Sequence, residues 1–154
     1  HNTLRLSLLR ASKWPDPTAD LGNHEFTSSL LPHEGDWREA EVVKRGYELN
    51  HPIVCVNASS HSGNLPNSHS FIDMKSKHAI LDTLKPSEDG KGIILRMYES
   101  SGGREEVQVT FGKSVLSADE TNLLEEKQVA VPVQKNKLSS NLKPFEVKTI
   151  LVSF

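Results

Sequence analysis

Two carboxylates and an imidazole recur at four-residue spacing in a polar stretch near the start of the chain. Asp16, Asp20 and His24 lie within residues 14–26, which also contain two prolines. Retaining glycoside hydrolysis needs two carboxyl groups about 5–5.5 Å apart, one acting as nucleophile and the other as acid and base. A loop that presents Asp16 and Asp20 together is therefore a candidate sugar-contacting site. Aspartates in proline-containing turns also accept backbone hydrogen bonds, and this structural role is the simpler interpretation.

His33 and Glu34 add two more metal-ligand residue types, but their spacing does not favour a metal site. Zinc needs three or four ligands converging at about 2.0–2.3 Å. His24 and His33 are nine residues apart with Pro32 between them, so we predict structural imidazoles and no metal. A Gly-x-Ser-x-Gly nucleophile elbow is also absent from the sequence. We assign no catalytic residue to this chain. Four further histidines are expected on the solvated surface: His51, His61, His69 and His78.

The composition argues against several classes of function. The 154 residues include 18 basic and 20 acidic ones, with a formal net charge of −2 and no basic stripe, so nucleic-acid binding has no electrostatic support. The longest apolar runs, such as Ile150–Val152, are too short to span a bilayer, and no signal peptide is visible. The single cysteine, Cys55, excludes an intrachain disulfide, and its neighbours Ile53, Val54 and Val56 predict a buried strand residue. We expect a cytoplasmic setting with no membrane partner.

The pattern of apolar residues predicts a mainly β chain with one helix. Leu4, Leu6 and Leu8 alternate with polar residues, which is the period of a half-buried strand. Asp36 and Glu39 have the spacing of a capping box and predict a helix over 36–49. Further strands are predicted over 24–31, 53–56, 71–75, 79–85, 92–99, 104–111, 121–126, 129–133 and 145–154, with an exposed loop over 57–70.

Short strands at intervals of about ten residues are typical of an antiparallel β-sandwich. Ser100–Gly103 reads as a hairpin turn, since glycine tolerates positive φ. The apolar period changes near residue 50, which predicts a boundary between residues 1–51 and 52–154. Because two strands and a helix cannot form an independent core, we expect the first part to complete a sheet of a longer polypeptide. Trp14 and Trp37 are expected to pack beneath the loop, although Trp14 could instead stack on a sugar ring.

A family resemblance rests on the long motif WPDPTADLGNHEFTSSLLPHEGDW at residues 14–37 and on the helix ending Leu49-Asn50-His51-Pro52. It continues through LKPSEDG at 84–90, ILRMYE at 94–99, NLLE at 122–125 and KPFEVKT at 143–149. These segments resemble the C-terminal region of glycoside hydrolase family 38 α-mannosidases, most strongly the cytosolic and bacterial branch. The resemblance extends over nearly the whole chain.

The resemblance implies a parent enzyme that hydrolyses α-mannosides with retention of configuration. Upstream it implies an α/β catalytic domain with zinc, an Asp nucleophile and an Asp general acid, followed by a helical bundle. Residues 1–51 would be the remnant of a large, galactose-mutarotase-like supersandwich, and residues 52–154 a small terminal β-sandwich. The metal-binding and nucleophile motifs are absent here, so no zinc or other cofactor is assigned to this chain. The family's equivalent loop lies near the cleft, which makes Asp16, Asp20 and His24 candidate substrate contacts.

The expected partner is the upstream catalytic domain of the same polypeptide, which this chain would support while bordering its cleft. The alternative is a free-standing sandwich module that binds a carbohydrate or a protein, and a third option is an inert domain of an unrelated hydrolase. A module should pair its first strand within its own sheet. A fragment should expose the face of Leu4, Leu6 and Leu8, or an open edge that favours self-association into a homo-oligomer.

Overall fold

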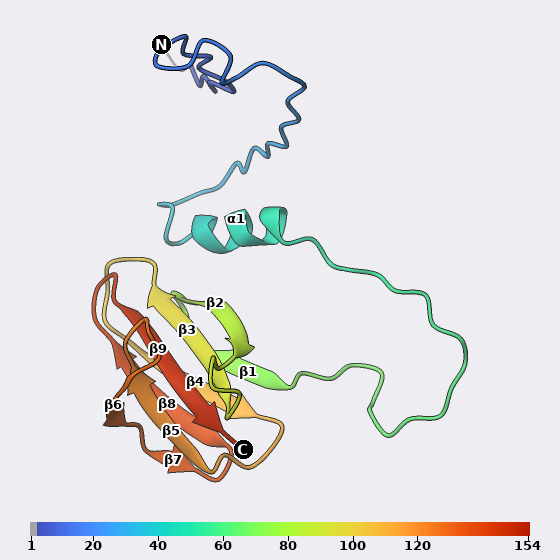
Figure 1. Ribbon diagram of the computed structural model, residues 1–154, viewed down its shortest axis with the longest axis vertical. Coiled ribbons are helices and arrows are strands. Elements are labelled where there is room, and N and C mark those ends of the chain that lie inside the picture. Colours follow the sequence, from blue (N-terminus) through green and yellow to red (C-terminus); the bar gives the residue numbers. More distant parts are fainter. Residues whose placement is uncertain (1–2) are drawn as a thin grey trace. The chain divides into compact units, whose positions relative to one another are not determined.

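A computed structural model describes residues 3–154 and divides the chain into two compact units, His1–Pro32 and His33–Phe154 (Figure 1). Within residues 3–32 the structure contains no helix or strand. The segments predicted as strands at 4–8 and 24–31 form no strand here. That they complete a sheet of a longer polypeptide stays a prediction. The boundary predicted at residue 51 concerns the domains of a parent polypeptide and stays a prediction.

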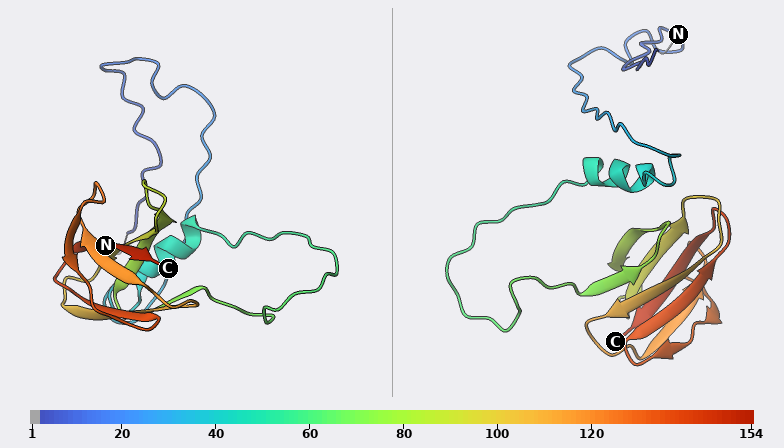
Figure 2. Two further views of the ribbon diagram at one scale, coloured as in Figure 1. Left: turned by 60° about the horizontal axis from the view of Figure 1, so that its bottom comes forward. Right: turned by 180° about the vertical axis from the view of Figure 1, so that it is seen from behind.

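The second unit contains two antiparallel sheets, which Figure 2 shows in two further views. The four-stranded sheet contains, in spatial order, β1 (Ile72–Lys75), β4 (Glu105–Phe111), β8 (Lys137–Leu142) and β7 (Val133–Gln134). The five-stranded sheet contains β2 (Ala79–Pro86), β3 (Ile93–Glu99), β9 (Val147–Ser153), β5 (Ser117–Thr121) and β6 (Lys127–Ala130). Every strand pair is antiparallel. The predicted fold class, a mainly β antiparallel sandwich with one short helix, is confirmed.

The core lies between the two sheets and is built by alternation along the strands. In β4, Val107, Val109 and Phe111 are at most 1% exposed, and the residues between them point away from the core. The facing sheet contributes Leu95 and Met97 from β3, and Ile150 and Val152 from β9, to the same cluster. Burial of these side chains supplies the main driving force for the fold.

In the second half of the chain, one predicted strand is misplaced and strands β5 and β8 differ from the prediction. Of the strand predicted over 121–126, only Thr121 is in a strand, as the last residue of β5, and residues 122–126 form the turn that follows. The side-chain oxygen of Asn122 accepts hydrogen bonds there from the N–H groups of Leu124 and Glu126, at 2.9 and 3.0 Å. Residues 117–120 of β5 and the whole of β8 were not predicted, and in β8 only the two leucines are apolar. The hairpin predicted at Ser100–Gly103 is wrong: this turn joins β3 to β4, which lie in different sheets and do not pair with each other.

Helix α1 (Val42–Asn50) is shorter than the predicted helix over 36–49. The predicted capping box does form: the N–H of Asp36 donates to Glu39 Oε2, and the N–H of Glu39 donates to Asp36 Oδ1, each at 3.0 Å. It organises a turn rather than the start of α1, because Glu41 has a left-handed backbone with φ of 51°. Within residues 3–154, this helix is far too short to cross a bilayer, and none qualifies as a membrane span.

The connection from α1 to β1, residues 51–71, contains no helix or strand (Figure 1). The exposed loop predicted over 57–70 is confirmed. The strand predicted at 53–56 and the predicted burial of Cys55 are wrong for this chain, since Cys55 is exposed. Its neighbours Ile53, Val54 and Val56 are 92%, 84% and 83% exposed. No strand of the described sandwich pairs with this segment.

Candidate functional site

The loop that contains Asp16 is a small ordered turn held by its own side chains. Asp16 Oδ1 accepts hydrogen bonds from the N–H and the hydroxyl of Thr18, both at 2.8 Å. The backbone bond and then the hydroxyl bond lower the pKa of Asp16 below its usual value. The N–H of Leu21 donates to the carbonyl of Thr18 at 3.1 Å and continues the turn. Asp16 therefore has the structural role expected of an aspartate in a proline-containing turn.

Asp20 and His24 are brought together, but through the backbone of Asp20. His24 Nε2 donates to the Asp20 carbonyl at 3.0 Å, which fixes the tautomer that carries the Nε2 proton. The imidazole also stacks on Phe26, with ring centroids 6.1 Å apart. The Asp16 carboxylate accepts its hydrogen bonds from Thr18 and makes none with Asp20 or His24. The loop thus presents an oriented imidazole beside Asp20, without the paired carboxylates that glycoside hydrolysis needs.

The aromatic and apolar side chains of the loop are not in a core. Trp14 is 84% exposed and Leu21 76% exposed. Trp37 is 39% exposed, and the Arg38 guanidinium lies 4.5 Å from the centre of its ring. The prediction that both tryptophans pack beneath the loop is therefore wrong for this chain. An exposed tryptophan next to ordered polar groups remains compatible with contact to a sugar or to another protein surface.

A groove of about 280 Å³ lies between the segment leading into α1 and the turn joining β1 to β2. Trp37, Val42, Met74 and Ile80 supply apolar walls, and Glu41 is its only carboxylate within the described residues. One carboxylate cannot perform two-carboxylate glycoside hydrolysis. In residues 3–154, no group of three or more His, Cys, Asp or Glu side chains has an arrangement that could hold a metal ion.

The sandwich contains a buried carboxylate at the end of β3, that of Glu99, which is 1% exposed. It accepts hydrogen bonds from the N–H groups of Ser101, Gly102 and Phe145, at 2.8, 2.7 and 3.0 Å, and from the Ser101 hydroxyl. Burial alone would raise the pKa of Glu99, but these donors outweigh it and lower the pKa to about 2. Glu99 therefore holds the β3–β4 turn against the segment that enters β9.

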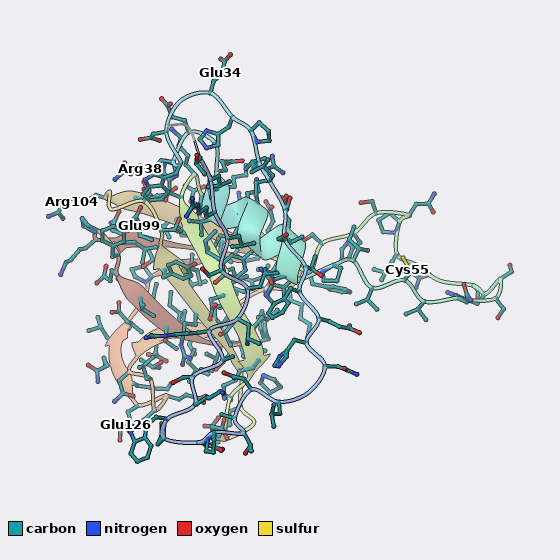
Figure 3. The ribbon with its side chains drawn as sticks, turned by 90° about the horizontal axis from the view of Figure 1, so that it is seen from above. Glu34, Arg38, Cys55, Glu99, Arg104 and Glu126 are labelled. Atoms are coloured by element: carbon teal, nitrogen blue, oxygen red, sulfur yellow. The ribbon has the colours of Figure 1, made fainter. Side chains whose placement is uncertain are left out.

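Three hydrogen bonds attach α1 and the segment before it to the sandwich. Arg38 Nε donates to the carbonyl of Ser101 at 2.7 Å, next to Glu99 (Figure 3). The Tyr47 hydroxyl donates to Asp82 Oδ1 at 3.0 Å and accepts from the Tyr98 hydroxyl at 3.1 Å. The bond with Tyr98, then burial and the bond with Asp82, raise the pKa of Tyr47 above its usual value. The β3–β4 turn that Glu99 holds is therefore also the turn whose carbonyl accepts the hydrogen bond from Arg38.

Comparison with known proteins gives a consistent result. Residues 78–150 match the family described as glycosyl hydrolases family 38 C-terminal beta sandwich domain. The chain is 36% identical to "Alpha-mannosidase 2C1" of Mus musculus over 98% of its length, and 37% identical to "Alpha-mannosidase G" of Dictyostelium discoideum over 94%. The chain belongs to glycosyl hydrolase family 38. It spans only 15% and 14%, respectively, of the lengths of these two relatives.

The match to the family 38 sandwich domain covers most of the structural core. It begins one residue before β2 and ends within β9, so it includes Glu99 and Phe145. Asp16, Asp20 and His24 lie before the matched residues, within the longer similarity to the mouse relative. Nothing in these matches assigns a role to the three residues, and their contact with substrate stays a prediction.

Proposed function

We propose that this chain is the non-catalytic C-terminal part of an α-mannosidase, whose catalytic domain lies upstream in the same polypeptide. The observation that carries the proposal is similarity over 94–98% of the chain to α-mannosidases of which it spans only 14–15%. The parent would hydrolyse terminal α-mannosides with retention, using zinc held by the upstream domain. We propose a cytoplasmic location for it. This chain would support the catalytic domain and border its cleft.

The chemistry of the described carboxylates supports a non-catalytic role. Retaining hydrolysis needs one carboxylate free to attack the sugar and a second group to transfer a proton. Asp16 is bonded to Thr18, and the groove beside α1 offers Glu41 alone. Glu99 is buried, and its oxygens already accept several hydrogen bonds. None of these groups provides the two-carboxylate geometry.

The first unit supports the fragment interpretation over the free-standing module. Leu4, Leu6 and Leu8 are 83%, 68% and 53% exposed, and no sheet of the described residues includes them. A free-standing module would pair this segment within its own sheet, where apolar burial stabilises it. The second candidate, a carbohydrate- or protein-binding module, is favoured only by the complete core of residues 33–154.

The first test compares the isolated chain with the full-length polypeptide on an aryl α-mannoside in the presence of zinc. We expect turnover by the full-length protein and none by the isolated chain. Zinc-dependent turnover by residues 1–154 would contradict a non-catalytic role. The same isolated chain should show no binding to mannose or manno-oligosaccharides up to millimolar concentration in a calorimetric titration. Saturable binding there would favour the module.

A second test addresses the loop in the full-length enzyme. Asp20→Asn should lower kcat/KM on an aryl α-mannoside by about tenfold, the effect of weakening one charged hydrogen bond to a sugar hydroxyl. The thermal unfolding temperature should not change, because the Asp20 interaction that orders the loop is its backbone carbonyl. Glu25→Gln, an exposed change in the same loop, is the control and should leave both quantities unchanged. If both variants changed kcat/KM equally, Asp20 would not be a substrate contact.

A further inference from the structure

The segment Ile53–Val56 has an environment that does not suit its residues. Three of its four residues are β-branched, a type that favours strands. Ile53, Val54 and Val56 are nevertheless 83–92% exposed, in a connection without regular structure that runs from residue 51 to residue 71. Long irregular connections inside a domain are uncommon and are often functional. Such a conflict between local preference and surroundings indicates a missing partner.

The alternation within the segment indicates what kind of partner it needs. In a strand, Ile53 and Cys55 would lie on one face, and Val54 and Val56 on the other. Both faces would be apolar, which is typical of a strand covered on both sides rather than of a strand with a solvated face. Pro52 precedes the segment, at a position where a strand tolerates a missing N–H.

The terminal sandwich itself offers poor edges for this segment. Edge strand β1 has four residues, including the charged Asp73 and Lys75, and edge strand β7 has only two. Edge strand β2 has a register shift between Leu81 and Thr83 and ends at Pro86. Edge strand β6 has four residues, begins with the charged Lys127, and pairs with β5 through a shifted register. Short length, charges, irregular register and proline are the features by which edge strands resist further pairing. These edges therefore favour a partner outside this sandwich.

We infer that Ile53–Val56 is a strand of a sheet in the upstream part of the same polypeptide, reached by the chain between α1 and β1. This inference rests on the proposed function, which places the chain in a much longer protein. The relatives support that occupant, because the chain spans only 14–16% of those that match nearly all of it. The polar residues 57–70 then form a tether that returns the chain to β1. The terminal sandwich is thereby attached to the upstream domain at a second place, besides the chain before α1.

Cys55 provides a built-in reporter, because it is the only cysteine of this chain and lies in the segment (Figure 3). Its alkylation by N-ethylmaleimide is followed by mass spectrometry of the peptide that contains it. In the isolated chain we expect reaction at the rate of an unstructured cysteine peptide. In the native full-length protein we expect a rate at least roughly 100-fold lower, because reaction then requires local opening. Denaturation should abolish the difference.

Two variants with the same charge change test whether Ile53–Val56 is covered in the full-length protein. Val54→Asp should not alter the unfolding of the isolated chain, where Val54 is exposed. In the full-length protein it should restore rapid alkylation of Cys55 and lower the unfolding temperature. Asn64→Asp, in the polar part of the same connection, should do neither. Should the full-length Val54→Asp protein not fold, the protection of Cys55 in the unsubstituted protein still decides the question.

Three results would overturn the inference. Equal alkylation rates in the isolated and full-length proteins would leave the segment without a partner. Protection already present in the isolated chain would place the strand on its own sandwich, or on a second copy if that protection rises with protein concentration. The proposed function is judged separately by α-mannoside turnover. A full-length enzyme that is active while Cys55 reacts freely contradicts this inference alone, and protection without turnover contradicts the function alone.

Discussion

Glu99→Gln should lower the free energy of unfolding of the sandwich by about 3 kcal/mol at pH 7, the cost expected when a buried carboxylate with several donors loses its charge. The carboxylate of Glu99 accepts hydrogen bonds from three backbone N–H groups and one hydroxyl. A glutamine amide keeps one oxygen but turns its NH₂ group toward donors. The β3–β4 turn and the start of β9 lose their common anchor together.

The effect of this substitution should depend on pH in a defined direction. The pKa of Glu99 is lowered from 4.5 to about 2 in the folded protein, so the folded state favours the charged carboxylate. The stabilisation is complete above about pH 5 and is lost progressively as the pH falls toward 2. The difference in unfolding free energy between the unsubstituted protein and Glu99→Gln should therefore shrink over this range. Denaturant unfolding at pH 7, 5, 4 and 3 measures it.

Glu106→Gln is the matched control for the Glu99 variant. Glu106 lies on β4 in the neighbouring sheet and is exposed, so its substitution should change the unfolding free energy by less than about 0.5 kcal/mol. Its effect should show no acid dependence of the kind expected for Glu99. Equal destabilisation by the two variants, or a Glu99 effect independent of pH, would mean that the buried carboxylate does not carry the stabilisation.

Much of the sandwich follows from signals that lie close together in the sequence. The alternating segment predicted over 104–111 is β4, and the adjacent Ser100–Gly103 is the turn joining it to β3. Both depend on neighbours within a few residues, so one sequence suffices. Strand β8 lacks such a signal, because an inward position is taken by the small polar Ser140 between Leu138 and Leu142. Only the facing sheet makes that position a core position.

The features of the site depend on contacts that the sequence does not display. Glu99 gains its importance from Ser101 and Gly102 beside it and from Phe145, which is 46 positions away. A glutamate at a strand end gives no sign of that distant donor. The turn role of Asp16 was predictable because its partner, Thr18, is two residues away. Sequence distance thus separates the part of the site that could be predicted from the part that could not.

The wrong predictions of burial have a common cause. Trp14 and Cys55 were expected to pack against protein, and both are exposed. An apolar pattern indicates that a surface will be covered, but it does not say which part of a polypeptide covers it. For a chain that spans 14–15% of the matching α-mannosidases, the expected cover lies in the remaining length. The pattern near Cys55 is the basis of the strand inferred above.

Phe111→Ala should have the largest effect on stability among single substitutions in the sandwich, a loss of about 3–5 kcal/mol. Phe111 is 1% exposed at the end of β4, and its ring meets the edge of Phe154 with centroids 5.5 Å apart. Its backbone bonds to Asn136 are retained in alanine, so the loss reports the cavity left by the ring. The unfolding temperature should fall by roughly 15–25 °C for a domain of this size. Calorimetry of the isolated chain measures it.

Phe71→Ala is the control that removes the same phenyl ring from a position where its loss leaves no buried cavity. Phe71 comes directly before β1, near the same end of the four-stranded sheet, but its side chain is 68% exposed. Its carbonyl still accepts from the N–H of Gly112 at 2.9 Å in alanine, so the local backbone contact is unchanged. The expected loss is below about 1 kcal/mol, as for surface positions in general. If both substitutions lowered the free energy of unfolding equally, Phe111 would not be packed in the core between the two sheets. The packing of β4 against the facing sheet would then have to be revised.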